Sequence, residues 1–451
     1  MRPELRDLRD REAATLERRT ATSGELYARA RRVLAGGVAS SFQRREPWPV
    51  HLARGEGARV WDVDGNEYLD FHNGFSTMLQ GHAHPAIGAA VAARYELGTL
   101  FAAPTEDGIA VAEELSRRFG LPRWRFTNSG TESTMGAVRT ARAITGRDDV
   151  VRILGTYHGH GDTLLVGAGE GRDRGVPPAT AELVHSVAFN DAEAMERRLT
   201  ELGREGRAAA CVVMEPVMTH VGIALPREGY LERVRELTRR HGALLIFDEV
   251  KTGLSVAAGG AIERFGVEPD LLTLAKALGG GLPTGAIGLS ADVAAAAEGM
   301  PHLGTFNAHP LGMAAARASL TEVLTPAAYE RLFALNDRLL AGCDAAIAEH
   351  ELPAHTVGLG AKGCIIHASE PVTDYESFKR VHDPELAELA WLWSMNRGLF
   401  VTPGRGQDWT LSVAHDAEAV DRYVEVFAEL AEALSPRSSG STARTYPPVG
   451  T

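Results

Sequence analysis

Between residues 105 and 300, short apolar runs alternate with segments of helical pattern, and this alternation constrains the fold more than any other feature. The apolar runs are WRFT (124–127), VVRIL (150–154), ACVVM (210–214), ALLIF (243–247) and LLTLA (271–275). Helical segments such as 131–145 and 229–242 lie between them. Strands that alternate with helices indicate a mostly parallel sheet covered on both faces. Because ligands of such sheets bind at the carboxyl ends of the strands, the residues after each run are the candidates for a site.

The rest of the chain predicts a second, smaller α+β domain. The segment VWDVDGNEYLDF (60–71) alternates apolar and polar residues around Asp-Gly-Asn, which is a hairpin pattern. After about residue 320, long helices are expected at 326–350 and 416–434, and short strands near 355–368 and 409–414. The predicted organisation is an N-terminal helical arm (1–34) that is either an exposed helix or partly ordered, a large domain (73–320), a small domain (35–72 with 321–435) and a mobile polar tail (436–451).

Composition and charge argue against several classes of function. Lys+Arg 47 against Asp+Glu 59 gives a net charge of −12, which disfavours nucleic acid or an anionic membrane surface as the main partner. Cys211, Cys343 and Cys364 are scattered and lack metal-ligand spacing, which fits a reducing compartment. The charged N-terminus is no secretory signal, and the longest stretch without charged residues, between Asp70 and Arg94, is too polar to span a membrane. We therefore predict a cytoplasmic protein that binds neither nucleic acid nor membranes.

Polar residues follow several of the apolar runs. The turn NSGT (128–131) opens a helix, and it is either a plain helix cap or a phosphate site built from free N–H groups and hydroxyls. Asp248 and Glu249 end the ALLIF run, where two acids either cap a helix, form an ion pair or take part in chemistry. The stretch YHGH (157–160) adds an aromatic ring and two imidazoles. No third ligand accompanies these histidines, so no metal site is predicted.

Lys276 follows the LLTLA run and precedes three consecutive glycines. Lysine is rarely buried without a partner, so it is either a surface side chain or a reactive amine in a pocket. The glycines suggest a close approach of the backbone to a ligand. A phosphate cradle, an aromatic face, a carboxylate and an amine are together the parts that hold pyridoxal phosphate. The lysine would form a Schiff base with its aldehyde, and the carboxylate would pair with its ring nitrogen.

These stretches resemble the class III (subgroup II) aminotransferases, and most closely the glutamate-1-semialdehyde aminomutase branch with its β-amino-acid and D-phenylglycine transaminase relatives. The resemblance covers about residues 36–434. Its motifs are VWDVDGNEYLDF (60–71), GHAHP (81–85), RFTNSGTEST (125–134), YHGHGD (157–162), EPV (215–217), LLIFDEVKTG (244–253), LAKALGGGLPTGAIG (274–288) and GTFNAHPLGMAAA (304–316). It implies the PLP-dependent transferase fold of type I, with a large domain around a mostly parallel central sheet and a smaller α+β domain. It also implies a homodimer with shared active sites.

The resemblance gives each matching residue a role. Lys276 would carry the Schiff base, and Asp248 would pair with the pyridine nitrogen. The other cofactor contacts would be Ser129, Gly130, Thr131 and the neighbouring subunit's Thr305 at the phosphate, Tyr157 and Val250 at the ring faces, and His158, Glu215 and His220 around the ring.

Two departures from the aminomutase pattern favour transamination. His220 stands where the aminomutase has an asparagine, and Gln407 stands where it has a glutamate that gates the pocket. A mutase must retain its intermediate, whereas a transaminase releases one keto product and binds a second substrate. We therefore predict an aminotransferase that moves an amino group between an amino donor, of β/ω- or D-amino acid type, and a keto acid acceptor by ping-pong half-reactions. The alternatives are the aminomutase reaction and a catalytically silent binding protein of the same fold.

Substrate contacts are predicted in two loops. Arg405, within 402–409, would clasp a carboxylate through its planar fork, unless it is a surface arginine. In the loop SSFQRREPWP (40–49), Arg44 or Arg45 would meet a carboxylate, and Phe42 and Trp48 would meet an apolar group.

Overall fold

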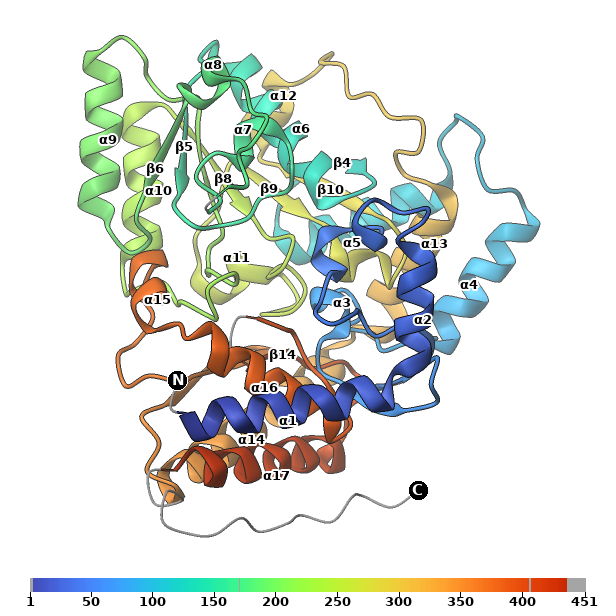
Figure 1. Ribbon diagram of the computed structural model, residues 1–451. Helices are drawn as coiled ribbons and strands as arrows, with labels where there is room; N and C mark the ends of the chain where they lie inside the picture. The colour runs from blue at the N-terminus through green and yellow to red at the C-terminus, as the bar shows by residue number, and fades with distance from the viewer. Residues whose placement is uncertain (1–2, 170, 405–406, 436–451) are drawn as a thin grey trace.

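The computed structural model describes residues 3–169, 171–404 and 407–435 (Figure 1). A seven-stranded sheet forms its centre, in the order β4 (Arg123–Thr127), β10 (Gly285–Leu289), β9 (Leu271–Leu274), β8 (Leu244–Asp248), β7 (Cys211–Met214), β5 (Val150–Ile153) and β6 (Val184–Val187). Strand β10 is antiparallel to both of its neighbours, and the other pairs are parallel. The predicted mostly parallel sheet is therefore confirmed. The predicted tail over 436–451 lies outside the described residues.

Helices cover this sheet because each carries an apolar stripe at helical spacing. Helix α9 (Ala192–Arg204) buries Met195, Leu199 and Leu202, and it packs against α10 (Tyr230–His241). Helix α6 (Gly130–Thr145) packs on β8, β9 and β10, so its N-terminus is fixed at the edge of the sheet where the parallel strands end. The other helices of this part are α3 (Asn73–Ser76), α4 (Pro85–Glu96), α5 (Glu106–Phe119), α7 (Asp162–Leu165), α8 (Pro178–Ala181), α11 (Gly260–Phe265), α12 (Ala291–Ala296) and α13 (Pro310–Ala318).

Two small sheets join segments that are far apart in the sequence. The first has the order β1 (Leu52–Glu56), β2 (Arg59–Asp62), β3 (Glu67–Asp70) and β13 (Leu399–Phe400), and its β2–β3 pair is the predicted hairpin. The second consists of β11 (His355–Leu359), β12 (Lys362–Ile366) and β14 (Gln407–Thr410). Helices α14 (Pro326–Glu349), α15 (Tyr375–Val381), α16 (Pro384–Asn396) and α17 (Ala417–Leu434) accompany them. The exact domain boundaries stay a prediction.

The N-terminal segment is docked on the body of the protein, in contrast to the exposed arm that we predicted. Helix α1 (Pro3–Arg19) lies along α16, and α2 (Ala21–Ala30) follows it (Figure 1). Leu5 and Leu16 are buried in the same core as α16. Asn396 donates a 2.6 Å hydrogen bond to Glu12, and Arg397 pairs with the same carboxylate at 3.2 Å. The apolar stripe of α1 is narrow, and these polar contacts further stabilise the packing of α1 on the body of the protein. None of the described helices is long and apolar enough to cross a membrane.

Candidate active site

A cavity of about 630 Å³ lies where the parallel strands end, a size typical of small-molecule sites. Most of the predicted site residues line it, as expected for residues that follow neighbouring strands. These lining residues are Phe42, Ser129, Gly130, Thr131, Tyr157, His158, Glu215, His220, Asp248, Val250 and Lys276.

Lys276 occupies a strained backbone position at the end of β9. Its φ is +46°, in the left-handed region that residues other than glycine rarely adopt, which costs on the order of 1–3 kcal/mol. Burial, with a further contribution from the ammonium group of Lys251, lowers the pKa of Lys276 to about 8. A fraction of the amine is therefore unprotonated near neutral pH and can act as a nucleophile or base.

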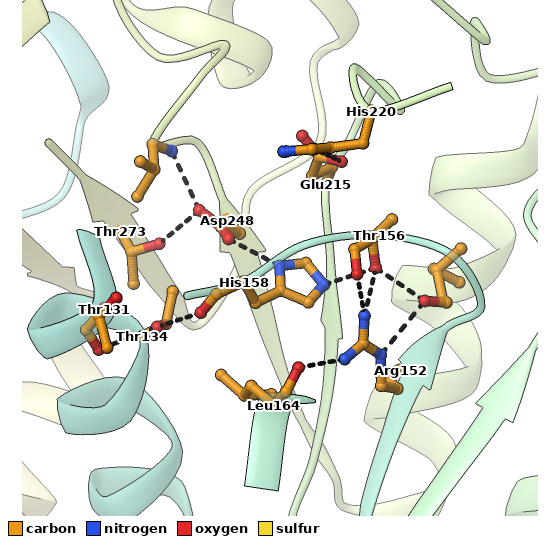
Figure 2. Close-up of polar contacts among 12 residues, drawn as sticks. Thr131, Thr134, Arg152, Thr156, His158, Leu164, Glu215, His220, Asp248 and Thr273 are labelled. Atoms are coloured by element: carbon orange, nitrogen blue, oxygen red, sulfur yellow. Dashed lines mark hydrogen bonds and ion pairs between the residues drawn. The ribbon is translucent and has the colours of Figure 1, made fainter. Parts of the chain in front are cut away.

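Asp248, at the end of β8, is buried with its carboxylate held by three groups (Figure 2). Oδ1 accepts hydrogen bonds from the Val250 N–H at 3.0 Å and from the Thr273 hydroxyl at 3.1 Å. Oδ2 lies 2.6 Å from Nδ1 of His158. A buried carboxylate fixed in this way is suited to hold a positively charged ring nitrogen.

His158 is itself fixed by a polar network that the sequence analysis missed (Figure 2). Its Nε2 lies 2.8 Å from the hydroxyl of Thr156, which also accepts a 3.0 Å hydrogen bond from Arg152. Arg152 is fully buried and donates to the backbone carbonyls of Leu164, Val166 and Thr156. A sequence signal did exist, because Arg152 is the one charged residue in the run VVRIL.

The turn at the start of α6 combines a helix cap with features of an anion site. Ser129 is the N-cap and its hydroxyl accepts from the Glu132 N–H at 3.2 Å, so the helix-cap interpretation holds. The first N–H groups of a helix have no intrahelical acceptor and attract anions. Gly159 packs against this turn, and a Cβ there would lie 2.7 Å from Cα of Thr131. The Thr284 hydroxyl, also in the cavity wall, is buried without a hydrogen-bond partner among the described residues.

Two walls of the cavity suit a flat ring. The Tyr157 ring lies 5.6 Å from that of Phe42, nearly perpendicular to it, and 5.5 Å from the imidazole of His220. Val250 lies close to Gly130, where an added Cβ would come within 2.8 Å of the Val250 side chain. The structure thus brings the predicted ring-face residues into one cavity.

Glu215 is buried beside His220, as Figure 2 shows. Burial opposes its ionisation, but His220 and the Thr219 hydroxyl, which donates at 2.6 Å, hold the pKa of Glu215 at about 2. The backbone carbonyl of Thr219 accepts a 2.6 Å hydrogen bond from Lys251, which also lines the cavity. Lys251 was not predicted, although the sequence has only four lysines among its 47 basic residues.

The residues predicted to contact the substrate lie in different environments. Arg45 lines the cavity, whereas the side chain of Arg44 is 64% exposed and lies 3.8 Å from Glu46. Trp48 donates to the Thr20 carbonyl at 3.0 Å and is not part of the cavity wall. Arg405 lies outside the described residues. Thr305 is exposed and does not line the cavity of its own chain.

Gln407 does not lie at the entrance of the cavity, where we had placed it. Its side chain is 2% exposed and is absent from the cavity wall. Because successive side chains of a strand point to opposite faces, the next residue of β14, Asp408, lines the cavity instead. Its Oδ2 lies 3.9 Å from Nζ of Lys251. The pocket therefore has a carboxylate one position after Gln407, the residue that we aligned with the glutamate of the aminomutase.

An amine, a buried carboxylate, a helix-start anion site and two ring walls in one α/β cavity define a fold type I pyridoxal-phosphate enzyme, and these residues fit that cofactor. Residues 41–383 match the profile of the family Aminotransferase class-III, and the chain belongs to this family. Pyridoxal phosphate is its cofactor.

Similar proteins cover almost the whole chain. Glutamate-1-semialdehyde 2,1-aminomutase 2 of Brevibacillus brevis is 37% identical over 418 residues, which is 89% of this chain and 96% of the relative. A solved glutamate-1-semialdehyde-aminomutase from Pseudomonas aeruginosa PAO1, in complex with PMP, has a TM-score of 0.89 at 33% identity, covering 96% of this chain and 99% of that chain. An omega-transaminase from Sphaerobacter thermophilus has a TM-score of 0.84 at 35% identity, covering 91% and 97%.

These comparisons correct the predicted reaction. Relatives that are 36–39% identical over most of the chain share the name glutamate-1-semialdehyde 2,1-aminomutase, so the prediction of an aminotransferase with ping-pong half-reactions is wrong. Gln407 does not favour transamination, because its side chain is outside the cavity. The departure at His220 changes a single residue of the cavity and does not outweigh similarity over the full length.

Proposed function

We propose that this protein is an aminomutase that converts glutamate 1-semialdehyde into its isomer 5-amino-4-oxopentanoate, with no external keto acid. The observation that carries this proposal is the similarity over about nine-tenths of the chain to relatives named for that reaction. The intact pair of Lys276 and Asp248 in one cavity supports catalysis over a silent binding role.

Lys276 has the properties of the base that such an isomerisation needs. When bound, pyridoxal phosphate supplies an electron-withdrawing ring that stabilises negative charge on a neighbouring carbon. The amine of Lys276, with a pKa of about 8, is unprotonated in roughly one-tenth of molecules at pH 7. It can therefore take a proton from one substrate carbon and return it elsewhere. Asp248 would hold the ring nitrogen, and the hydrogen bonds to its carboxylate would keep it oriented for that contact.

The cavity also has groups suited to the remaining polar parts of this substrate. Arg45, Arg172 and Lys251 line it and offer positive charge to a carboxylate. Asp408 offers an acceptor for an amino group, because its Oδ1 is buried without a hydrogen-bond partner among the described residues. An aminomutase must hold its substrate in place between two amino transfers, and groups of both charges support that retention.

We include a homodimer and a cytoplasmic location in this proposal. Thr305 lies in an exposed loop between Leu303, which is 90% exposed, and Phe306, which is 53% exposed. Large apolar side chains gathered on a surface are typical of an interface. A second copy of the chain packed on this loop would bring Thr305 towards the partner's phosphate site, as the family resemblance implies.

The test is to incubate the holoenzyme with glutamate 1-semialdehyde while every keto acid is omitted. We expect 5-amino-4-oxopentanoate to form in molar equivalence to the substrate consumed, at a rate that pyruvate or 2-oxoglutarate does not increase. Lys276→Ala should abolish this conversion and serves as the control for uncatalysed reaction. Conversion that depends on an added keto acid would instead show a transaminase and overturn the proposal.

A further inference from the structure

The hydroxyl of Thr156 connects a buried guanidinium to the imidazole that contacts Asp248 (Figure 2). It accepts from Nη2 of Arg152 at 3.0 Å, lies 2.8 Å from Nε2 of His158, and lies 2.7 Å from the Ile153 carbonyl. Thr156, His158 and Arg152 are all buried, with at most 1% of each exposed. Solvent therefore does not satisfy these groups, and their hydrogen bonds must be arranged among themselves.

A hydroxyl has one proton and two lone pairs, which limits the arrangements. Arg152 has no acceptor groups, so it occupies one lone pair of the Thr156 oxygen. The single hydroxyl proton then goes either to the Ile153 carbonyl or to Nε2 of His158. The Ile153 carbonyl has a donor in either case, because Nε of Arg152 lies 3.3 Å from it. An unprotonated Nε2 of His158 has no other donor among the described residues, so in the neutral imidazole the hydroxyl donates to Nε2 and every group is satisfied. A protonated Nε2 would instead donate to the second lone pair of Thr156, and the surrounding charges decide between the two arrangements.

The charges around His158 favour the first arrangement once the cofactor is bound. The carboxylate of Asp248 contacts the imidazole, that of Glu215 interacts with it electrostatically, and the guanidinium of Arg152 lies beyond Thr156. Burial lowers the pKa of Arg152 to about 10, which leaves the guanidinium charged at neutral pH. A protonated ring nitrogen on Asp248 adds the second positive charge. Asp248 is then paired with this cation, and a further positive charge at His158, between that pair and Arg152, is disfavoured by repulsion.

We propose that Thr156, held by Arg152, is a positioning residue that fixes His158 as the neutral tautomer with its proton on Nδ1. In this state Nδ1–H donates to Oδ2 of Asp248, and Asp248 stays a carboxylate that can hold the ring nitrogen. The proposal rests on the cofactor site and not on which reaction the enzyme catalyses.

The test is nitrogen NMR of the holoenzyme with selectively ¹⁵N-labelled histidine. The His158 signals are identified by their loss in a His158→Gln variant. We expect one protonated ring nitrogen, Nδ1, and one unprotonated ring nitrogen, Nε2, that shows a hydrogen-bonded shift. Thr156→Val has nearly the same shape but no hydroxyl, and it should move the Nε2 signal. Thr156→Ser keeps the hydroxyl and should leave that signal in place.

Turnover gives a second measurement on the same variants. Because one hydrogen bond is worth on the order of 1 kcal/mol, kcat of Thr156→Val should fall several-fold with little change in KM. The kcat of Thr156→Ser, which keeps the hydroxyl, should stay close to the wild-type value. A wild-type imidazole protonated on both nitrogens, or on Nε2 alone, would overturn the proposal. An Nε2 signal that is unchanged in Thr156→Val would overturn it too. If that variant does not fold, the wild-type spectrum still decides. The spectrum needs no substrate, so it stands apart from the aminomutase test.

Discussion

Nδ1 of His158 lies 2.6 Å from Oδ2 of Asp248, and both side chains are buried beneath the cavity that contains Lys276. The two residues are 90 positions apart in the sequence and come from the ends of different strands. Parallel strands bring them together, because their carboxyl ends meet at one edge of the sheet. His158 therefore orients the acid that we expect to hold the ring nitrogen, and His158 is in turn in contact with Thr156.

Replacing Asp248 with Asn should remove the charge that holds a protonated ring nitrogen while keeping the size of the side chain. Losing one partner of a buried ion pair costs about 3–5 kcal/mol, so kcat should fall by at least about a hundredfold. Steady-state rates with saturating cofactor measure this. Asp408→Asn, which changes a carboxylate elsewhere in the cavity, is the matched control and should retain the cofactor's wild-type absorbance. A normal kcat in Asp248→Asn would contradict the assigned role.

The sequence allowed the central sheet to be predicted because its strands are short apolar runs separated by amphipathic helices. Five predicted runs correspond to β4, β5, β7, β8 and β9. Strand β10 was not predicted, since two of its five residues are glycine. Packing explains these glycines, because a Cβ on Gly288 would lie 2.8 Å from the Trp124 ring of the neighbouring strand. Such close contacts are tertiary and leave no mark on local propensity.

The site was predictable where residues directly follow a strand, and less so elsewhere. Asp248 and Lys276 both line one cavity for that reason. Gln407 and Asp408 show the limit, because a shift of one residue in a strand exchanges the face that lines the pocket for the face that is buried. The pairing of Gln407 with Ile365 of β12 sets this register, and no short motif encodes it.

Replacing Lys251 with Met should raise the pKa of Lys276, because the neighbouring ammonium group disfavours a second positive charge. The pH dependence of cofactor capture by the apoenzyme measures this directly, since only the unprotonated amine reacts. The midpoint, near pH 8 in the wild type, should move to higher pH. Lys251→Arg retains the charge and should leave the midpoint nearly unchanged. A midpoint that moves equally in both variants would point to altered packing instead of charge.

Replacing Gly159 with Ala should weaken both the fold and the binding of the cofactor. Gly159 has a φ of +92°, and the added Cβ would lie 2.7 Å from Cα of Thr131, at the start of α6. We expect a loss of about 1–3 kcal/mol in the free energy of unfolding, measured with urea, and a higher Kd for pyridoxal phosphate. Gly203→Ala is the control, because it lies in helix α9 with open space around it and should be neutral or slightly stabilising. Equal stability of the two variants would disprove the predicted clash.

Replacing Glu249 with Gln should change how the stability of the protein depends on pH. Burial raises the pKa of Glu249 to about 8, although the Ala261 N–H and the Thr252 hydroxyl partly oppose this. A carboxyl group with a raised pKa binds more protons in the folded state than in the unfolded state, whose pKa is about 4.5. Its contribution to stability is therefore complete below pH 4.5 and is lost as the pH rises to about 8.

Urea unfolding of wild type and Glu249→Gln between pH 5 and pH 8 measures this effect. The free energy of unfolding of the wild type should decrease with rising pH relative to that of the variant, because glutamine has no proton to lose. Glu268→Gln, at an exposed position, should follow the wild-type slope. If Glu249→Gln and the wild type have the same slope, Glu249 does not carry an extra proton in the folded state at neutral pH. In that case its two oxygens, which accept from Ala261, are those of a charged carboxylate.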